Sequence, residues 1–290
     1  MRNVKQIYRA NSQHWVGDGF LVQPLFSHMG EDRGTDPFLM LDYAAPRVFE
    51  PGRISSPRGV GQHPHKGFET VTIAYQGEVA HRDSSGGGGV IKEGDVQWMT
   101  AGAGIIHEEF HSEAFSKSGG MFEMVQLWVN LPAKDKNTPA RYQHLAKENI
   151  PVVALPDNTG HLRLIAGDYE GVKGAAETFT EMNVWDVVVN AGKEAVISVP
   201  ANHSLSLVVL RGNVTLNGKD QAGAGQLVGF ENGGGEVRIA AGSEEVKILL
   251  LSGVPIAEPV VGYGPFVMNT AEEIREAIND FNSGRFGSIH

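Results

Sequence analysis

Residues 61–77 read GQHPHKGFETVTIAYQG and combine a pair of histidines with an alternating strand pattern. Successive side chains of a β-strand point to opposite faces, so residues 69–75 divide into two sets. The first set is Glu69, Val71, Ile73 and Tyr75, and the second is Thr70, Thr72 and Ala74. The pair Gln76-Gly77 then signals a turn. This stretch predicts a β-strand that begins just after the histidines.

Most of the remaining chain consists of short apolar or alternating segments separated by Gly, Asn, Asp and Pro. Such spacing is typical of an all-β sandwich or barrel. Further strands are expected at residues 79–82, 90–92, 96–100, 122–130, 184–190, 205–211, 213–217 and 246–251. One helix is expected near the C-terminus, where Thr270 and Glu273 form a capping box and Gly284 gives the stop signal. The predicted fold class is therefore all-β with a C-terminal helix.

The composition of the 290 residues excludes several classes of function. The formal net charge is −10 and there is no basic block, which argues against direct nucleic-acid binding. The chain has no cysteine, so disulfides, cysteine-ligated metals and thiol nucleophiles are excluded, and a metal site must use histidine and carboxylate ligands. Residues 1–15 lack the apolar stretch of a secretory signal, and no apolar run approaches the roughly 20 residues of a membrane span. A cytoplasmic location without membrane association is expected.

Two halves of the chain resemble each other. Tyr75-Gln76-Gly77-Glu78-Val79 matches Leu210-Arg211-Gly212-Asn213-Val214, and Gly94-Asp95-Val96 matches Gly225-Gln226-Leu227. Residues 133–155 are polar and punctuated by proline, as expected of a passage between two modules. We therefore predict an internal duplication with an N-terminal metal-binding domain at residues 1–140 and a degenerate C-terminal domain with the terminal helix at residues 141–290.

The strongest chemical signal joins His63 and His65 with residues 101–109, AGAGIIHEE, which contain His107 and Glu109. In extended segments, residues i and i+2 point to the same side, so each pair can reach one ion, while Glu108 points the other way. Three imidazoles and one carboxylate leave up to two positions of an octahedral ion open. This ligand set suits iron, manganese, nickel, copper or zinc, and open positions suit oxygenase chemistry.

Other residues compete for roles at this site. Glu69 is the rival carboxylate, although its own face of the strand is apolar. His111 is expected to have a solvent-facing or supporting role, and His81 to stabilise a turn. The remaining histidines have no partner at ligand spacing: His14, His28, His144, His161, His203 and His290.

The chain resembles the pirin family of the cupin superfamily over about residues 15–145, with a weaker match beyond. The resemblance rests on Asp36-Pro37-Phe38, Leu41-Asp42, HPHKGFETVTIAYQGEVAHRDS, GDVQWMTAGAGIIHEE and Leu127-Trp128-Val129-Asn130-Leu131-Pro132. It implies two jelly-roll β-barrel (cupin) domains and one mononuclear iron-type site on His63, His65, His107 and Glu109. In the second module, the aligned positions are Ser198, Pro200, Arg238 and Ala240, which cannot form such a site.

The resemblance also implies a function, because several pirins are dioxygenases acting on the flavonol quercetin. The leading hypothesis is a dioxygenase that uses one divalent metal, with iron expected first and nickel, copper, manganese or zinc as alternatives. Its substrates would be a small planar phenol and dioxygen, with Glu109 as the catalytic base. The pocket is expected to be lined by Phe38, Ile73, Trp98, Met99, Ile106 and Met124. Alternatives are a metal-containing regulatory protein that binds an enzyme or transcription factor, and a sugar or small-acid isomerase.

Overall fold

A computed structural model describes residues 1–290 as two compact units. The histidine unit comprises Ser12–Glu31, Phe38–Lys147 and Ile256–His290, and the apolar-core unit comprises Met1–Asn11, Asp32–Pro37 and Glu148–Pro255. Neither unit is an uninterrupted half of the chain, because each also contains segments from the other half. As limits of independently folding domains, residues 1–140 and 141–290 remain a prediction.

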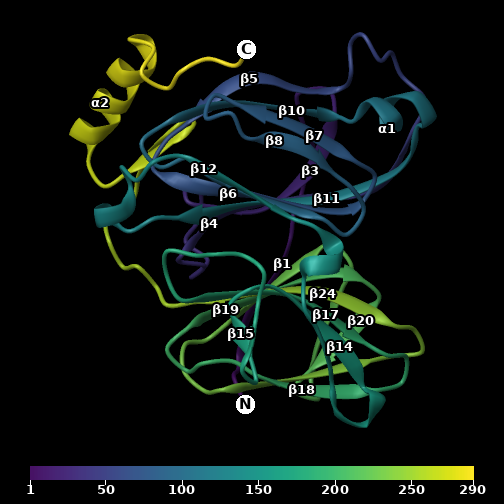
Figure 1. Cartoon of the computed structure of the whole chain (residues 1–290). Helices are drawn as coiled ribbons and strands as arrows, with labels where there is room; N and C mark the ends of the chain where they lie inside the picture. The colour runs from purple at the N-terminus through teal and green to yellow at the C-terminus, as the bar shows by residue number, and fades with distance from the viewer. The chain divides into compact units, whose positions relative to one another are not determined.

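The histidine unit is built on a seven-stranded and a four-stranded antiparallel sheet (Figure 1). The larger sheet has the order β12 (Arg141–Leu145), β9 (Val96–Thr100), β6 (Phe68–Gln76), β11 (Gly120–Asn130), β4 (Phe38–Phe49), β3 (Phe20–Ser27) and β2 (His14–Val16). The smaller has the order β5 (Gly59–His65), β10 (Ile105–His111), β7 (Val79–Asp83) and β8 (Gly88–Ile91). The short helix α1 (Glu113–Ser118) precedes β11. The two sheets form the layers between which the site lies.

The apolar-core unit has two sheets of the same sizes. Its larger sheet has the order β1 (Val4–Arg9), β22 (Gln226–Phe230), β19 (Ser204–Arg211), β24 (Val246–Gly253), β17 (Met182–Val189), β14 (Gly160–Ala166) and β13 (Val152–Ala154). Its smaller sheet has the order β18 (Glu194–Ser198), β23 (Glu236–Ala241), β20 (Asn213–Leu216) and β21 (Asp220–Gly223). A separate two-stranded ribbon joins β15 (Asp168–Tyr169) to β16 (Val172–Lys173).

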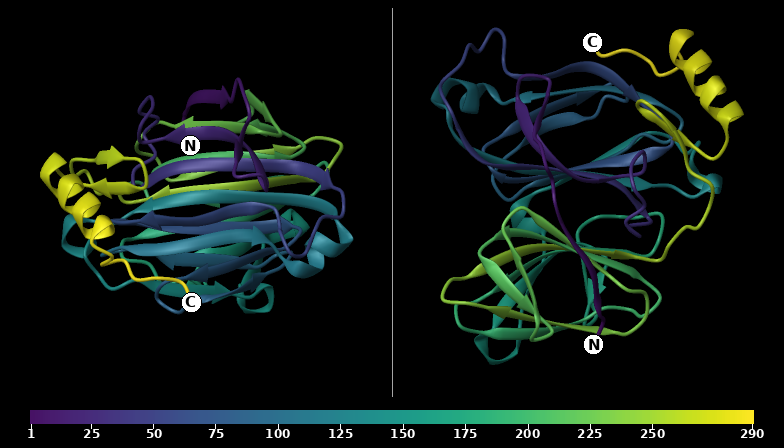
Figure 2. Two further views of the ribbon diagram at one scale, coloured as in Figure 1. Left: turned by 90° about the horizontal axis from the view of Figure 1, so that it is seen from above. Right: turned by 180° about the vertical axis from the view of Figure 1, so that it is seen from behind.

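The strand orders of the two units correspond position by position, which supports the internal duplication. With β6 matched to β19 and β9 to β22, every other strand of both sheets finds a counterpart. The edge strand β12 then corresponds to β1, although β1 comes from the N-terminus, the purple end of the chain in Figure 2.

The strand predicted at residues 69–75 forms β6, which ends at a turn as expected. Gly77 in that turn has φ +83°, and a Cβ atom there would lie 2.6 Å from the ring of Phe122. Glycine is therefore the residue that this turn accepts.

The predicted C-terminal helix is confirmed as α2 (Ala271–Asn282) with its capping box on Thr270 and Glu273. Ile274 and Ala277 are buried in a cluster with Phe266 and Phe286, next to the ribbon of β25 (Val261–Tyr263) and β26 (Phe266–Met268) (Figure 2). The helix thus covers part of the histidine unit.

The mostly β character is confirmed, but residues 133–155 are more than a passage between modules. They contain β12 and β13, which are edge strands of the two large sheets, and short 3₁₀ turns at Ala133–Asp135 and Lys147–Asn149. Their polar composition reflects the half-exposed edges of the sheets. None of the helices combines the length and the apolar character that crossing a membrane requires.

Candidate metal centre

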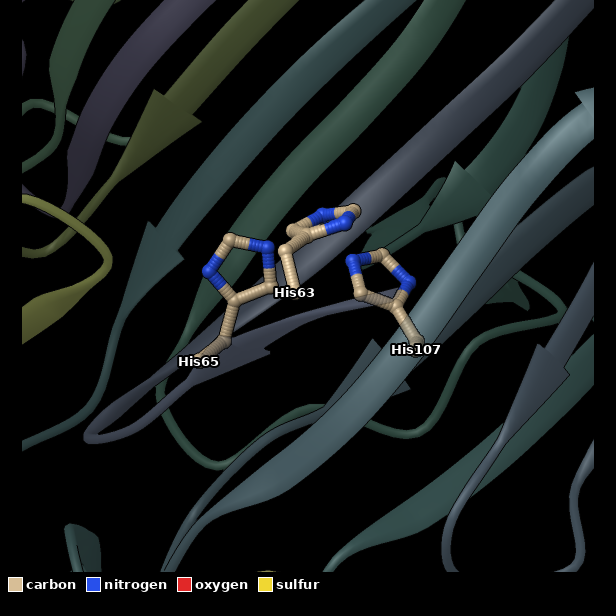
Figure 3. Close-up of side chains that lie close together, drawn as sticks. All are labelled: His63, His65 and His107. Atoms are coloured by element: carbon tan, nitrogen blue, oxygen red, sulfur yellow. The ribbon is translucent and has the colours of Figure 1, made fainter. Parts of the chain in front are cut away.

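Three of the four predicted ligands lie together between the sheets of the histidine unit (Figure 3). His63 and His65 come from β5 and His107 from β10, and the antiparallel register places His107 opposite His63. The ring centroids of His63 and His107 are 4.2 Å apart, and each is 4.9 Å from the centroid of His65. One ring nitrogen from each residue lies within 4.8 Å of the other two.

The hydrogen bonds of these rings leave lone pairs directed at no protein group. His63 donates from Nδ1 to the carbonyl oxygen of Gly61 over 2.7 Å, so its Nε2 carries a lone pair. Nε2 of His107 and Nδ1 of His65 are buried and have no hydrogen-bond partner. Burial and the neighbouring His63 lower the pKa of His65 to about 3, and burial followed by the neighbouring histidines also lowers the pKa of His107 well below its usual value. Neutral, unpartnered imidazoles are the donor set that a transition metal requires.

A chain of hydrogen bonds behind the site fixes the orientation of His107. His81 Nε2 donates to Asp83 Oδ2 over 2.9 Å, so in the neutral ring Nδ1 is an acceptor. Nδ1 of His107 lies 3.4 Å from that acceptor. A proton on Nδ1 of His107 would be donated to His81 and would leave the lone pair of His107 on Nε2. The ring of Tyr142 stacks on that of His81, with the two ring centroids 4.8 Å apart. His81 is thus a supporting residue of the site and does not merely stabilise a turn.

Glu109 lies beside this cluster, but its carboxylate is at ligand spacing from only one of the three histidines, His107. Its carboxylate falls within 4.8 Å of ring nitrogens of His81 and His107. The pairing of β10 with β5 shifts register between His107 and Glu109, so the two residues do not continue one regular ladder. Oε1 accepts hydrogen bonds from Thr72 Oγ1 at 3.1 Å and from Gln97 Nε2, whereas no protein hydrogen bond ends on Oε2. Glu109 as the fourth ligand and base stays a prediction.

The other two carboxylates of the motif point elsewhere. Glu69 is fully buried and accepts a hydrogen bond of 2.7 Å from Thr100 Oγ1. Since Thr72 faces Glu109, the alternation along β6 places Glu69 on the opposite face of the sheet, where burial raises its pKa to about 7. Glu108 pairs with Arg82, also away from the site, as expected.

His111 belongs to neither the solvent nor the metal site. It is buried against the rings of Phe49 and Phe122, at centroid distances of 4.7 and 4.9 Å, and its Nε2 donates to the carbonyl oxygen of Gly19. The expectation of a solvent-facing or supporting role was therefore wrong, because the aromatic core at the far end of β10 encloses this ring.

The three histidines and Glu109 open into a cavity of about 450 Å³, within the size range of small-molecule sites. Its lining consists of Val16, Phe20, Val22, Met40, Asp42, Val60, His63, His65, His107, Glu109, Met124, Gln126, Trp128, Gly264 and Pro265. Of the six lining residues expected from the sequence, only Met124 is present. Ile73 and Trp98 lie on the other face of the sheet, because their neighbours Thr72 and Gln97 face Glu109.

The apolar-core unit carries apolar side chains at the corresponding positions. Val79 corresponds to Val214 in the matched turns of the two units. Val79 pairs with His111 and Val214 pairs with Ala241, so His111 corresponds to Ala241. Counting along these strands and across to the next pair of strands, the counterparts of His63, His65, His107 and Glu109 are, in that order, Ile197, Val199, Val237 and Ile239. All four are buried in one apolar cluster. The positions expected from the sequence, Ser198, Pro200, Arg238 and Ala240, were one residue too late. A slip of one residue exchanges the faces of a strand.

Several supporting residues were missed by sequence reasoning. The alternating pair His81 and Asp83 carried a local signal, since residues i and i+2 of a strand share a face. Thr72 and Gln97 carried none, because their places depend on which strands become neighbours.

Comparison with known proteins agrees with this arrangement. The family model described as pirin matches residues 19–129, and that of the pirin C-terminal cupin domain matches residues 184–287. The chain is 51% identical to a Pseudomonas aeruginosa protein named provisionally as a quercetin 2,3-dioxygenase, over 100% of both chains. It is 34% identical to pirin-like protein 2 of Arabidopsis thaliana, over 99% of this chain and 91% of that one. The crystal structure of quercetin 2,3-dioxygenase from Acinetobacter baumannii is similar with a TM-score of 0.95 and 53% identity, over 100% of both chains. The chain therefore belongs to the pirin family and has the cupin-type, two-domain fold of that family.

Proposed function

We propose that this protein is a metal-dependent dioxygenase that cleaves flavonols such as quercetin. The observation that carries the proposal is the cluster of His63, His65 and His107 at the wall of a largely apolar cavity of about 450 Å³. The names of the Pseudomonas and Acinetobacter relatives support the same reaction.

The residues that would hold the metal are the three histidines, with Glu109 as the fourth ligand. Their imidazole nitrogens and the nearby carboxylate suit a divalent ion, with iron as the first candidate and nickel, copper, manganese or zinc as alternatives. When bound, the ion would supply Lewis acidity toward the 3-hydroxyl oxygen of the flavonol and a binding position for dioxygen.

Glu109 is the residue that moves a proton in this proposal. Its Oε1 is held by Thr72 and Gln97, so Oε2 is the oxygen that would bind the metal and, when it loosens from the metal, would accept the proton of the 3-hydroxyl group. Removing that proton makes the flavonol an electron-rich enolate, which is the form that reacts with dioxygen. His81 and Asp83 keep the ring of His107 in the tautomer that has a lone pair on Nε2.

The apolar lining holds a flat aromatic molecule and excludes water. Phe20, Met40, Met124 and Trp128 lie on the large sheet, whereas the histidines lie on the small sheet that faces it. Aromatic and thioether side chains pack well against planar rings. A planar phenol between the layers would thus reach the histidines with one edge.

The paired sheets of each unit support the jelly-roll barrel expected from the resemblance. We further propose that the protein acts in the cytoplasm. The domain limits 1–140 and 141–290 are likewise proposed as folding units.

The test is turnover of quercetin by metal-loaded protein in air, followed by loss of substrate absorbance, dioxygen uptake and carbon monoxide release. The His107→Ala variant, prepared in the same way, is the control. Turnover by the wild type alone is expected. Full metal occupancy without turnover would contradict the enzymatic proposal and favour the alternative, a metal-containing protein that regulates an enzyme or transcription factor.

A further inference from the structure

The cavity contains one titratable residue that the proposed reaction does not use. Five of its fifteen lining residues are histidines or acids, and four of these are the proposed ligands. The fifth is Asp42 on β4, in the opposite sheet.

The register of the large sheet relates Asp42 to Thr72, the residue that donates a hydrogen bond to Glu109. Asp42 pairs with Gln126 on β11, and Gln126 pairs with Thr72 on β6. Thr72 in turn donates to Glu109. Since adjacent strands are about 4.8 Å apart, Asp42 lies roughly 10 Å along the sheet from Thr72. Asp42 is therefore separated by two strand spacings from Thr72, the residue that holds the proposed base.

The carboxylate of Asp42 is buried and accepts no hydrogen bond from the protein. The residue is only 8% exposed, and no protein hydrogen bond ends on its side-chain oxygens. Its neighbours on the same face of β4 are Met40 and Ala44, which offer no donor. Burial raises the pKa of the Asp42 carboxyl, and the charge of His14 acts in the opposite sense. A buried acceptor in this state gains from a ligand that donates a hydrogen bond.

We propose that Asp42 accepts a hydrogen bond from a hydroxyl group of a planar phenolic ligand other than the 3-hydroxyl group at the proposed base. The inference rests on the proposed function, because it needs a ligand whose 3-hydroxyl group lies at the histidine cluster. It names the substrate class more narrowly: a polyhydroxylated flavonol is preferred over one that carries the 3-hydroxyl group alone. Asp42 is thus a specificity-determining residue.

The test compares the binding of quercetin and of 3-hydroxyflavone, the parent flavonol, to metal-loaded protein without dioxygen. Hydrogen bonds to a charged acceptor are strong enough for the wild type to bind quercetin about tenfold more tightly or better. Asp42→Val, which removes both oxygens, should reduce that preference by about tenfold and leave the affinity for 3-hydroxyflavone nearly unchanged. Asp42→Asn, which keeps a weaker acceptor and nearly the same size, should fall between the two.

The matched control is Asp95→Asn, because Asp95 is equally buried, directly precedes β9 of the same sheet and is absent from the cavity lining. Its preference for quercetin should equal that of the wild type. An unchanged preference in both Asp42 variants, or a wild type that does not distinguish the two ligands, overturns the inference even if quercetin is turned over. A preference that depends on Asp42 without turnover in air would instead overturn the proposed dioxygenase and leave the inference standing.

Discussion

The two units have the same strand orders but fill the space between their sheets in opposite ways. Where the histidine unit has His63, His65, His107 and Glu109, the apolar-core unit has Ile197, Val199, Val237 and Ile239. The apolar-core unit demonstrates that the architecture is complete without polar groups at these positions. The fold itself therefore does not require histidines or a carboxylate at these positions.

The two interiors also differ in how they contribute to the stability of the fold. The apolar-core unit packs its interior side chains into one cluster, as a stable domain does. The histidine unit keeps a cavity of about 450 Å³ and unpartnered nitrogens on His65 and His107. Buried polar groups without partners destabilise a fold unless something binds them. A metal ion at this position would bind these unpartnered nitrogens and so remove the destabilisation that they cause.

The largest expected effect follows from removing a ligand. His63→Ala should reduce bound metal from one ion per chain to nearly none and quercetin turnover to background, because two imidazoles and a neighbouring carboxylate hold the ion poorly. Elemental analysis after metal loading measures this. His161→Ala, at an exposed histidine of the apolar-core unit, is the control and should behave as the wild type. A variant at His63 that retains full metal would disprove the assignment.

The second effect separates the carboxylates. Glu109→Gln should lower kcat for quercetin by about 10²- to 10⁴-fold, the usual contribution of a general base. Glu69→Gln should keep the metal and change kcat only slightly, because Glu69 lies on the other face of β6. Both constants are compared at equal metal content. The reverse ranking would mean that the general base is Glu69.

The third effect concerns the counterpart of His63. Ile197→Ala should lower the free energy of unfolding by about 2–5 kcal/mol, because it leaves a hole in a packed core. Metal content should not change. Val196→Ala, at the adjacent exposed position, should change stability by less than about 0.5 kcal/mol. Urea unfolding of the three proteins measures the difference, and equal destabilisation by both variants would refute the packing comparison.

The smallest expected effect is on metal content, which should not change as the pH is lowered. Burial lowers the pKa of His65 to about 3 and that of His107 well below its usual value, so both rings stay neutral at pH 5. Protons should therefore not displace the metal from His65 and His107 between pH 7 and pH 5. In the metal-free protein the unfolded state takes up these protons first, so the free energy of unfolding should fall as the pH drops below about 6.5. Metal release with a midpoint near pH 6.5 would contradict the burial of these ligands.

Local alternation made the histidine cluster predictable. The pairs His63 with His65 and His107 with Glu109 are each two residues apart, and the structure brings the histidines of both pairs together. The strand at residues 69–75 and the C-terminal helix were predictable for the same reason, since period and capping are local properties.

Contacts between strands were not predictable from the sequence. The register shift that separates Glu109 from His63 arises where β10 meets β5, and the place of Asp42 depends on the pairing of β4 with β11. The counterparts in the apolar-core unit were misplaced by one residue because one inserted or deleted residue reverses the two faces of a strand.

The most direct test of the account is anomalous X-ray diffraction from crystals of the metal-loaded protein, measured at the absorption edge of the metal. The account predicts one peak per chain, bounded by ring nitrogens of His63, His65 and His107 with a carboxylate oxygen of Glu109 as the fourth ligand, and no peak near Ile197 and Val237. A peak that is bound by His81 and Glu109 and not by His63 and His65, or a second peak in the apolar-core unit, would contradict it.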